Sequence, residues 1–119
     1  MAGQKVKGLQ RIVNAFRFSL AGFKAVWNNE AAFRQELFLL IIATPVALTL
    51  GHSALEKLAL IGSIILILLM ELINSAIEAV VDRIGLEQHE LSGRAKDIGS
   101  ATVLFAFFWA IIVWVTLLF

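Results

Sequence analysis

The sequence contains no cysteine, so disulfide bonds and thiolate metal sites are excluded. Charge is also scarce: only 16% of the 119 residues are charged, whereas 60% are hydrophobic. Soluble domains carry about 45–50% apolar residues, so a soluble core would not use this much hydrophobic surface. Lys5 and Lys7 are not followed by a short apolar core with a cleavage site, which argues against a removable signal peptide. The composition predicts a single membrane domain over residues 1–119.

Three apolar segments are candidates for membrane-spanning helices, which need about 20 consecutive apolar residues. Residues 58–70 and 98–119 contain no charged residue. Residues 37–50 reach the required length if the helix begins near Asn29. Between the first two segments, Ser53 and Glu56 have the spacing of a capping box, which predicts a short turn. We therefore predict an all-α membrane protein with spanning helices at 29–50, 54–84 and 90–119.

The segment before the first span, residues 1–28, has the pattern of a basic amphipathic helix on a membrane surface. Its apolar residues recur at helical spacing, and basic residues occupy much of the remainder. Of the ten Lys and Arg residues, only Lys57 lies on the side of the turn between the first and second spans, opposite the others. By the positive-inside rule, the amino terminus and the connection between the second and third spans face the cytoplasm. The apolar residues of this helix are Val6, Leu9, Ile12, Val13, Phe16, Leu20, Phe23 and Trp27.

Polar residues recur every three or four positions along the second span and so share one helix face: Glu71, Asn74, Ser75, Glu78 and Asp82. An ionisable group at membrane depth costs at least about 2.5 kcal/mol, so by default it indicates a functional site. A structural ion pair with Arg34 or Lys96 is the alternative for any one of these carboxylates. The five residues together favour function.

The residue types around this face are suited to phosphoryl transfer, in which a metal, a cation and a base surround the reacting phosphate. Glu30 and Glu78, on different helices, are the kind of ligands that bind Mg²⁺ together with phosphate and water. Lys96 is suited to contact a phosphate. Glu71, nearest the hydrocarbon, is placed to accept a proton from a lipid hydroxyl. Asp97 and residues 87–89 are candidates for contacts with a nucleotide.

Other interpretations remain open from these residues alone. Carboxylates within spans also mark ion or proton pathways, although such a path would distribute them across the bilayer. An accessory subunit without activity would tolerate alanine at these positions. The sequence has no glycine-rich phosphate loop and no protein-kinase signature. Small residues four apart, at Ser75 and Ala79 and at Ala95 and Gly99, allow helices to approach closely. Since three helices have little interior, we expect an oligomer.

Three segments resemble the bacterial integral-membrane diacylglycerol kinase family: NEAAFRQE at 29–36, ELINSAIEAVVDR at 71–83 and HELSGRAKDIGS at 89–100. The resemblance covers nearly the whole chain. It implies a homotrimeric bundle in the bacterial inner membrane, with active sites shared between subunits and open to the cytoplasm. The implied reaction transfers the γ-phosphoryl group of MgATP to diacylglycerol and gives phosphatidic acid. The implied partners are ATP, Mg²⁺ and the lipid, and no nucleic acid is expected.

The resemblance also implies roles for individual residues. Glu71 would be the catalytic base, with Asn74 as a supporting polar group, and Glu30 and Glu78 would be the metal ligands. Phe18 stands where the family often has a tyrosine, and Leu20 where a tryptophan is common. The expected ATP contacts are Arg11, Phe18, Glu30, Glu78, Glu87, Gln88, His89, Lys96 and Asp97. The expected lipid contacts are Arg11, Lys24, Trp27, Phe33, Arg34, Gln35, Glu36, Glu71 and Ser100.

A related branch of the same family phosphorylates undecaprenol. Ser75, the AAFRQE stretch at 31–36 and Gly99 with Ser100 are more similar to the diacylglycerol branch. The undecaprenol kinase is therefore the second alternative.

Overall fold

The computed structural model describes residues 7–119; residues 1–6, and with them the predicted first part of the surface helix at Lys5 and Val6, lie outside the described residues. Four helices account for nearly all of the described chain. They are α1 (Leu9–Asn29), α2 (Ala31–Leu50), α3 (Ala54–Ile84) and α4 (Glu90–Leu118). The last three are long and apolar enough to cross a membrane. The prediction of an all-helical protein with three candidate spans is confirmed.

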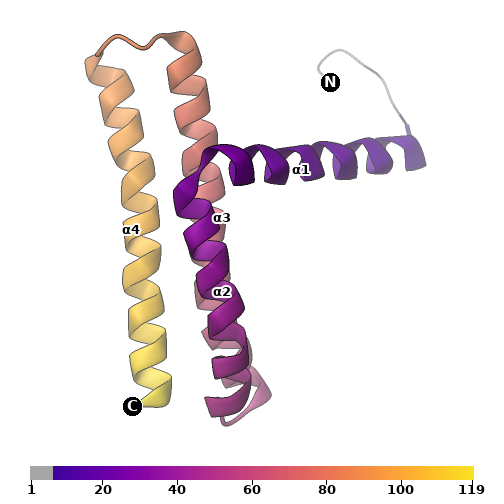
Figure 1. Cartoon of the computed structure of the whole chain (residues 1–119), viewed down its shortest axis with the longest axis vertical. Coiled ribbons are helices and arrows are strands. Elements are labelled where there is room, and N and C mark those ends of the chain that lie inside the picture. The colour runs from indigo at the N-terminus through magenta and orange to yellow at the C-terminus, as the bar shows by residue number, and fades with distance from the viewer. Residues whose placement is uncertain (1–6) are drawn as a thin grey trace.

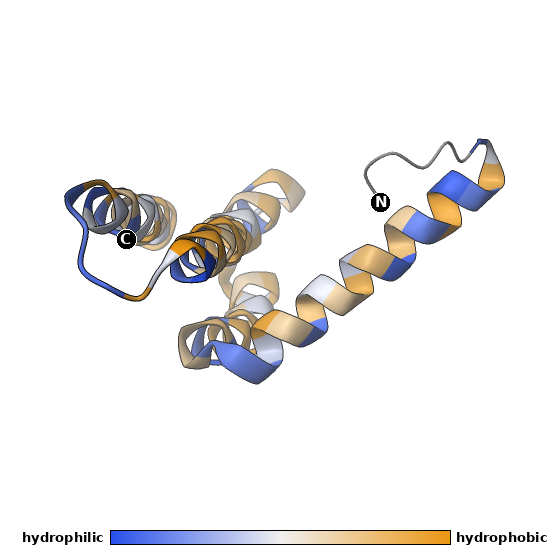
Figure 2. Ribbon diagram, turned by 90° about the horizontal axis from the view of Figure 1, so that it is seen from above, coloured by the Kyte–Doolittle hydropathy of each residue, from blue (hydrophilic) through white to orange (hydrophobic). Residues whose placement is uncertain are grey.

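Helices α2, α3 and α4 lie side by side, and α1 projects sideways from the bundle (Figure 1). No residue of α1 is buried. Hydrophobic and hydrophilic residues alternate along this helix (Figure 2), and the exposed apolar ones include Leu9, Ile12 and Phe16. Such a face is typical of a helix that lies on a membrane surface. The membrane location of α1 stays a prediction.

The chain changes direction at Glu30, the single residue between α1 and α2. Glu30 has an extended backbone, with φ −122° and ψ 104°. Its N–H still donates to the carbonyl of Val26 at 2.8 Å, so the last turn of α1 is closed on it. The side chain of Arg34 donates to the carbonyl of Trp27 across the bend. The break therefore places an acidic side chain at the corner between α1 and the bundle.

Helix α3 is the central element, because it packs against both α2 and α4. Its buried apolar side chains Ile64, Ile67 and Leu68 pack against Phe33 and small residues of the neighbouring helices. Most large apolar side chains elsewhere on α2 and α4 are exposed, as expected for surfaces that face lipid. The core consists of Phe33, Ala43, Ile64, Ile67, Leu68, Ala106 and Ala110.

The turn between α2 and α3 is short, as predicted. The Ser53 hydroxyl accepts a hydrogen bond from the N–H of Glu56 at 3.1 Å, so Ser53 caps α3. In a full capping box, the Glu56 carboxylate would accept from the N–H of Ser53. It accepts instead from the N–H of His52, at 2.7 Å. The predicted box is thus half formed, and the exposed His52 ring lies 3.2 Å from the same carboxylate.

The three candidate spans differ in length. At about 1.5 Å per residue, the 20 residues of α2 cover about 30 Å, the thickness of the hydrocarbon layer. The 31 residues of α3 and the 29 of α4 cover about 46 and 43 Å. Figure 1 shows that both continue past the level at which α1 joins α2. We call the connection between these two helices and the helix turns on either side of it, residues 79–97, the polar end.

Far from the polar end, a polar contact joins α3 to α4. The indole N–H of Trp114 lies 3.1 Å from both the carbonyl of Leu60 and the hydroxyl of Ser63. The Ser63 hydroxyl itself donates to the Leu60 carbonyl at 2.7 Å. Water does not compete for such bonds in an apolar environment, so the indole fixes the register of the two helices.

Replacing Trp114 with Phe keeps an aromatic ring but removes this donor. We expect a loss of about 1 kcal/mol of stability, the range found for polar contacts between membrane helices. Reversible unfolding in mixed micelles, followed by circular dichroism, measures the difference. Trp109→Phe is the matched control, because its side chain is 51% exposed. Equal losses in both variants would contradict the role given to the indole N–H.

Candidate active site

The acidic face of α3 is organised by the side chain of Asn74. Its amide nitrogen donates to Glu78 at 3.0 Å and lies 3.5 Å from Glu71. Glu71 and Asn74 are only 5% and 7% exposed. The amide therefore connects a carboxylate at membrane depth with one nearer the polar end, and it fixes their relative position.

Glu30, at the corner between α1 and α2, faces the same surface of α3. Together with Glu78 and Asp82 it lines a groove of about 650 Å³ between α1 and α3, which we call the carboxylate groove. Loss of solvation raises the pKa of the Glu30 carboxyl above its usual value. The negative charges of Glu78 and Glu71 raise this pKa further, and the Ser75 hydroxyl opposes the shift. Two predicted metal ligands from different helices thus lie close enough to repel each other.

The carboxylates of Glu30 and Glu78 form a small donor set for a metal ion. No cluster of three or more His, Cys, Asp or Glu side chains suited to a metal occurs among residues 7–119. Mg²⁺ does not require one, because it usually takes one or two carboxylates and fills its other positions with phosphate oxygens and water. Neither Glu30 nor Glu78 forms an ion pair with a described residue. Glu30 and Glu78 repel each other and form no ion pair with a described Lys, Arg or His residue. Such a pair is suited to bind a Mg²⁺ ion that also carries phosphate.

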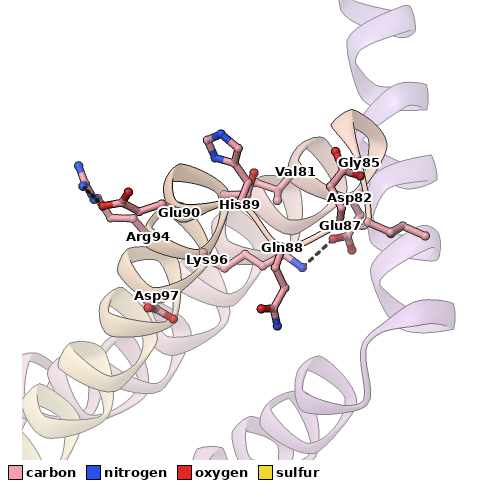
Figure 3. Close-up of a pocket in the computed structure, with 13 residues that line it drawn as sticks. Val81, Asp82, Gly85, Glu87, Gln88, His89, Glu90, Arg94, Lys96 and Asp97 are labelled. Carbon is pink, nitrogen blue, oxygen red and sulfur yellow. Dashed lines mark ion pairs between the residues drawn. The ribbon is translucent and has the colours of Figure 1, made fainter.

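A second groove, of about 730 Å³, lies at the polar end around the connection between α3 and α4. We call it the polar groove. Lys96 crosses from α4 to Asp82 on α3, with 2.6 Å between Nζ and Oδ1, and Figure 3 shows this pair. The structural alternative considered above, a cross-helix ion pair, thus applies to Asp82. Five of the predicted ATP contacts line this groove: Glu87, Gln88, His89, Lys96 and Asp97.

A third groove, of about 570 Å³, lies between α1, α2 and α3 and is lined mainly by apolar side chains. We call it the apolar groove. The predicted lipid contacts Lys24, Trp27 and Phe33 all line it. Phe23 and Leu72 line both this groove and the carboxylate groove. Asp82 likewise lines both the carboxylate groove and the polar groove. Neighbouring grooves therefore share lining residues, and the carboxylates of Glu30, Glu78 and Asp82 line the middle one. The buried carboxylate of Glu71 lines none of the three.

Some predicted site residues are not brought to these grooves within one chain. Arg11 and Phe18 are exposed on α1, Gln35 is exposed on α2, and Ser100 is exposed on α4. Glu36 behaves differently: it is 7% exposed and its carboxyl lies next to that of Glu71. Its Oε1 atom has no hydrogen-bond partner among the described residues.

Two features of the site could not be predicted from the sequence: the position of Asp82 and the side chains that neighbouring grooves share. Asp82 was placed on the acidic face without a role of its own, and its position between two grooves depends on the packing of α4. The side chains that join the grooves, Phe23 and Leu72, resemble any other apolar residue of an amphipathic helix. Only the bend at Glu30 brings them together.

The distribution of charged residues distinguishes an ion-conducting protein from an enzyme. Residues 37–50, 58–70 and 98–119 contain no charged side chain. All three segments belong to helices that are candidates for spanning the membrane. A conduction path would need polar groups along them. The concentration of carboxylates at one level favours a reaction site.

Comparisons with known proteins identify the family to which this chain belongs. A sequence model of the prokaryotic diacylglycerol kinase family matches residues 17–118. The proteins named diacylglycerol kinase from Escherichia coli (strain K12) and Haemophilus influenzae are 52% and 49% identical to this chain. These alignments cover 93% and 97% of the chain and 91% and 98% of the relatives. A similar relative from Pseudomonas aeruginosa is 49% identical, over 93% of the chain and 90% of the relative. The chain belongs to the prokaryotic diacylglycerol kinase family.

Proposed function

We propose that this protein transfers the γ-phosphoryl group of ATP to the free hydroxyl of diacylglycerol, giving phosphatidic acid and ADP. The observation that carries the proposal is the position of the carboxylate groove between an apolar groove and a polar groove. A lipid requires apolar surroundings and a nucleotide requires polar ones. Their reacting atoms therefore have to meet between the apolar groove and the polar groove. Family membership and the names of the relatives support this reaction.

In the proposed mechanism, Glu71 accepts the proton of the lipid hydroxyl. The hydroxyl oxygen then forms a bond to the γ-phosphorus, the bond from that phosphorus to the β–γ bridging oxygen breaks, and ADP leaves. Asn74 holds Glu71 and Glu78 at a fixed separation through its amide. Glu30 and Glu78 would hold Mg²⁺, which when bound offsets the negative charge of the phosphates.

The substrate contacts follow from the grooves and the family resemblance. Lys96, Asp97 and the connection at 87–89 would contact ATP from the polar groove. Lys24, Trp27 and Phe33 would line the site of the lipid, with Arg34 and Glu36 close to its headgroup. By the distribution of Lys and Arg, the polar end and α1 would face the cytoplasm, with the chain in the bacterial inner membrane.

We also propose that the active form is a homotrimer whose sites are shared between neighbouring chains. Two observations support an oligomer. The buried oxygen Oε1 of Glu36 has no hydrogen-bond partner among the described residues. Arg11, Gln35 and Ser100 are exposed and line none of the three grooves of their own chain. A neighbouring chain would bring such residues to a site.

The function is tested by phosphate transfer from labelled ATP in mixed micelles. We expect the purified protein to label diacylglycerol, and Glu71→Gln to abolish labelling without unfolding, because the amide is not a base. Glu56→Gln, in the turn far from the grooves, is the matched control and should retain activity. Competition between diacylglycerol and undecaprenol identifies the preferred acceptor. Labelling of undecaprenol alone would establish the second alternative, and labelling of neither lipid would end the kinase proposal.

Metal binding should depend on pH through Glu30. Protons and the metal compete for this carboxylate, and its raised pKa means that the competition begins at a higher pH than for an ordinary glutamate. The apparent affinity for Mn²⁺, measured by electron paramagnetic resonance in the presence of ATP, should therefore fall as the pH falls through this pKa. Glu30→Gln should weaken binding and remove this part of the pH dependence. Unchanged affinity in both Glu30→Gln and Glu78→Ala would argue against this pair as the ligands.

Shared sites are tested by mixing two impaired variants, Arg11→Ala and Glu71→Gln. In a mixed trimer, the intact Arg11 of one chain would complete the intact Glu71 site of its neighbour. We expect the co-reconstituted mixture to be more active than the sum of the two variants assayed apart, and native mass spectrometry to detect three chains. Activity equal to that sum would contradict sharing of this residue.

A further inference from the structure

Gly99 on α4 faces the organising amide of the site, the carboxamide of Asn74. It is buried, and a Cβ atom built on it would lie 3.3 Å from Cγ of Asn74 and closer than van der Waals contact to the Asn74 Oδ1. The third near atom, Cδ1 of Ile77, would be at 3.6 Å, an ordinary contact. Space for a side chain at Gly99 is therefore blocked by one group, the carboxamide of Asn74.

The carboxamide of Asn74 is also held by the two carboxylates of α3. Its nitrogen is committed to Glu78 and Glu71, at 3.0 and 3.5 Å, and its oxygen Oδ1 is buried without a hydrogen-bond partner among the described residues. Hydrogen bonds to the two carboxylates thus hold the amide plane in one orientation. In that orientation, its oxygen points into the space that Gly99 leaves open.

We propose that Gly99 is a positioning residue for phosphoryl transfer, because its missing side chain leaves the space in which the Asn74 amide spans Glu71 and Glu78. This inference rests on the proposed function. A methyl group at position 99 need not separate the helices, because the carboxamide is the end of the Asn74 side chain and rotates away when its hydrogen bonds to the carboxylates break. Rotation would break the link between the base and a metal ligand while leaving the helix pair intact.

Other glycines in the membrane helices lack this constraint. A Cβ atom added to Gly62 on α3 would meet no other atom within 4 Å. Gly62→Ala and Gly99→Ala are therefore matched substitutions, each made inside a helix, where alanine is favoured over glycine. They differ in whether the new methyl group meets the carboxamide of Asn74.

The test compares Gly99→Ala with Gly62→Ala in the full-length protein. We expect kcat of Gly99→Ala to fall by about tenfold to a hundredfold, the range for a displaced catalytic group. We also expect weaker Mn²⁺ binding in the presence of ATP, measured by electron paramagnetic resonance, and an unfolding midpoint no lower than that of the parent protein. Gly62→Ala should match the parent protein in activity and metal binding.

A double-substitution cycle decides whether the effect passes through Asn74. In the Asn74→Ala background the carboxamide is absent, so adding Gly99→Ala should produce no further loss of Mn²⁺ affinity or of residual activity. An equal loss in both backgrounds would overturn the proposal, as would parental kcat in Gly99→Ala or a fall in activity that accompanies unfolding. If the parent protein labels diacylglycerol and Gly99→Ala does so equally well, this inference fails and the proposed function stands.

Discussion

The structure depends on the burial of a carboxyl group at Glu71 inside a bundle of apolar helices. A group of this kind at membrane depth costs several kcal/mol unless polar partners surround it. Its hydrogen-bonding neighbour on the same helix is the Asn74 amide, at 3.5 Å, and it forms no ion pair with a described cation. Packing elsewhere offsets this cost, along the apolar core of α3 and through the indole contact of Trp114. The bundle thus keeps a poorly solvated acid beside the place where the substrates would meet.

The unequal lengths of the helices separate two environments around this acid. Helix α2 matches the hydrocarbon thickness, whereas α3 and α4 continue beyond it. The extra turns of α3 and α4 line the polar groove and contain the Asp82–Lys96 pair. The bend at Glu30 places the end of α1 beside the apolar groove. Because the bend and the start of the extra turns lie at one level, the carboxylate groove forms at the boundary between the two environments. The bend also explains why the acid of Glu30 is part of the site.

Features that depend only on the spacing of residues within one helix could be predicted from the sequence. The acidic face from Glu71 to Asp82 and the cap at Ser53 follow from spacing alone, and both occur in the structure. Contacts between helices could not be predicted in this way. Helix α4 is apolar on nearly all sides, so its pattern does not indicate which face meets α3. The close approach of Gly99 to Asn74 and the choice of Asp82 as the partner of Lys96 depend on that rotation. The small residues at 95 and 99 indicated a close approach, but not its partner.

The balance of charge around the carboxylate groove constrains how a nucleotide could enter it. Glu30, Glu78 and Asp82 line the groove, Glu71 lies close enough to raise the pKa of Glu30, and the nearby Lys96 is already paired with Asp82. The negative charge of Asp82 also contributes to the raised pKa of Glu30. A polyphosphate alone would be repelled by this excess of negative charge, because groups in a poorly solvated groove are weakly screened. A polyphosphate that arrives with a divalent cation would reduce the repulsion among the carboxylates instead of adding to it. Under the proposed function, this arrangement of acids would favour a metal–nucleotide complex over the free nucleotide.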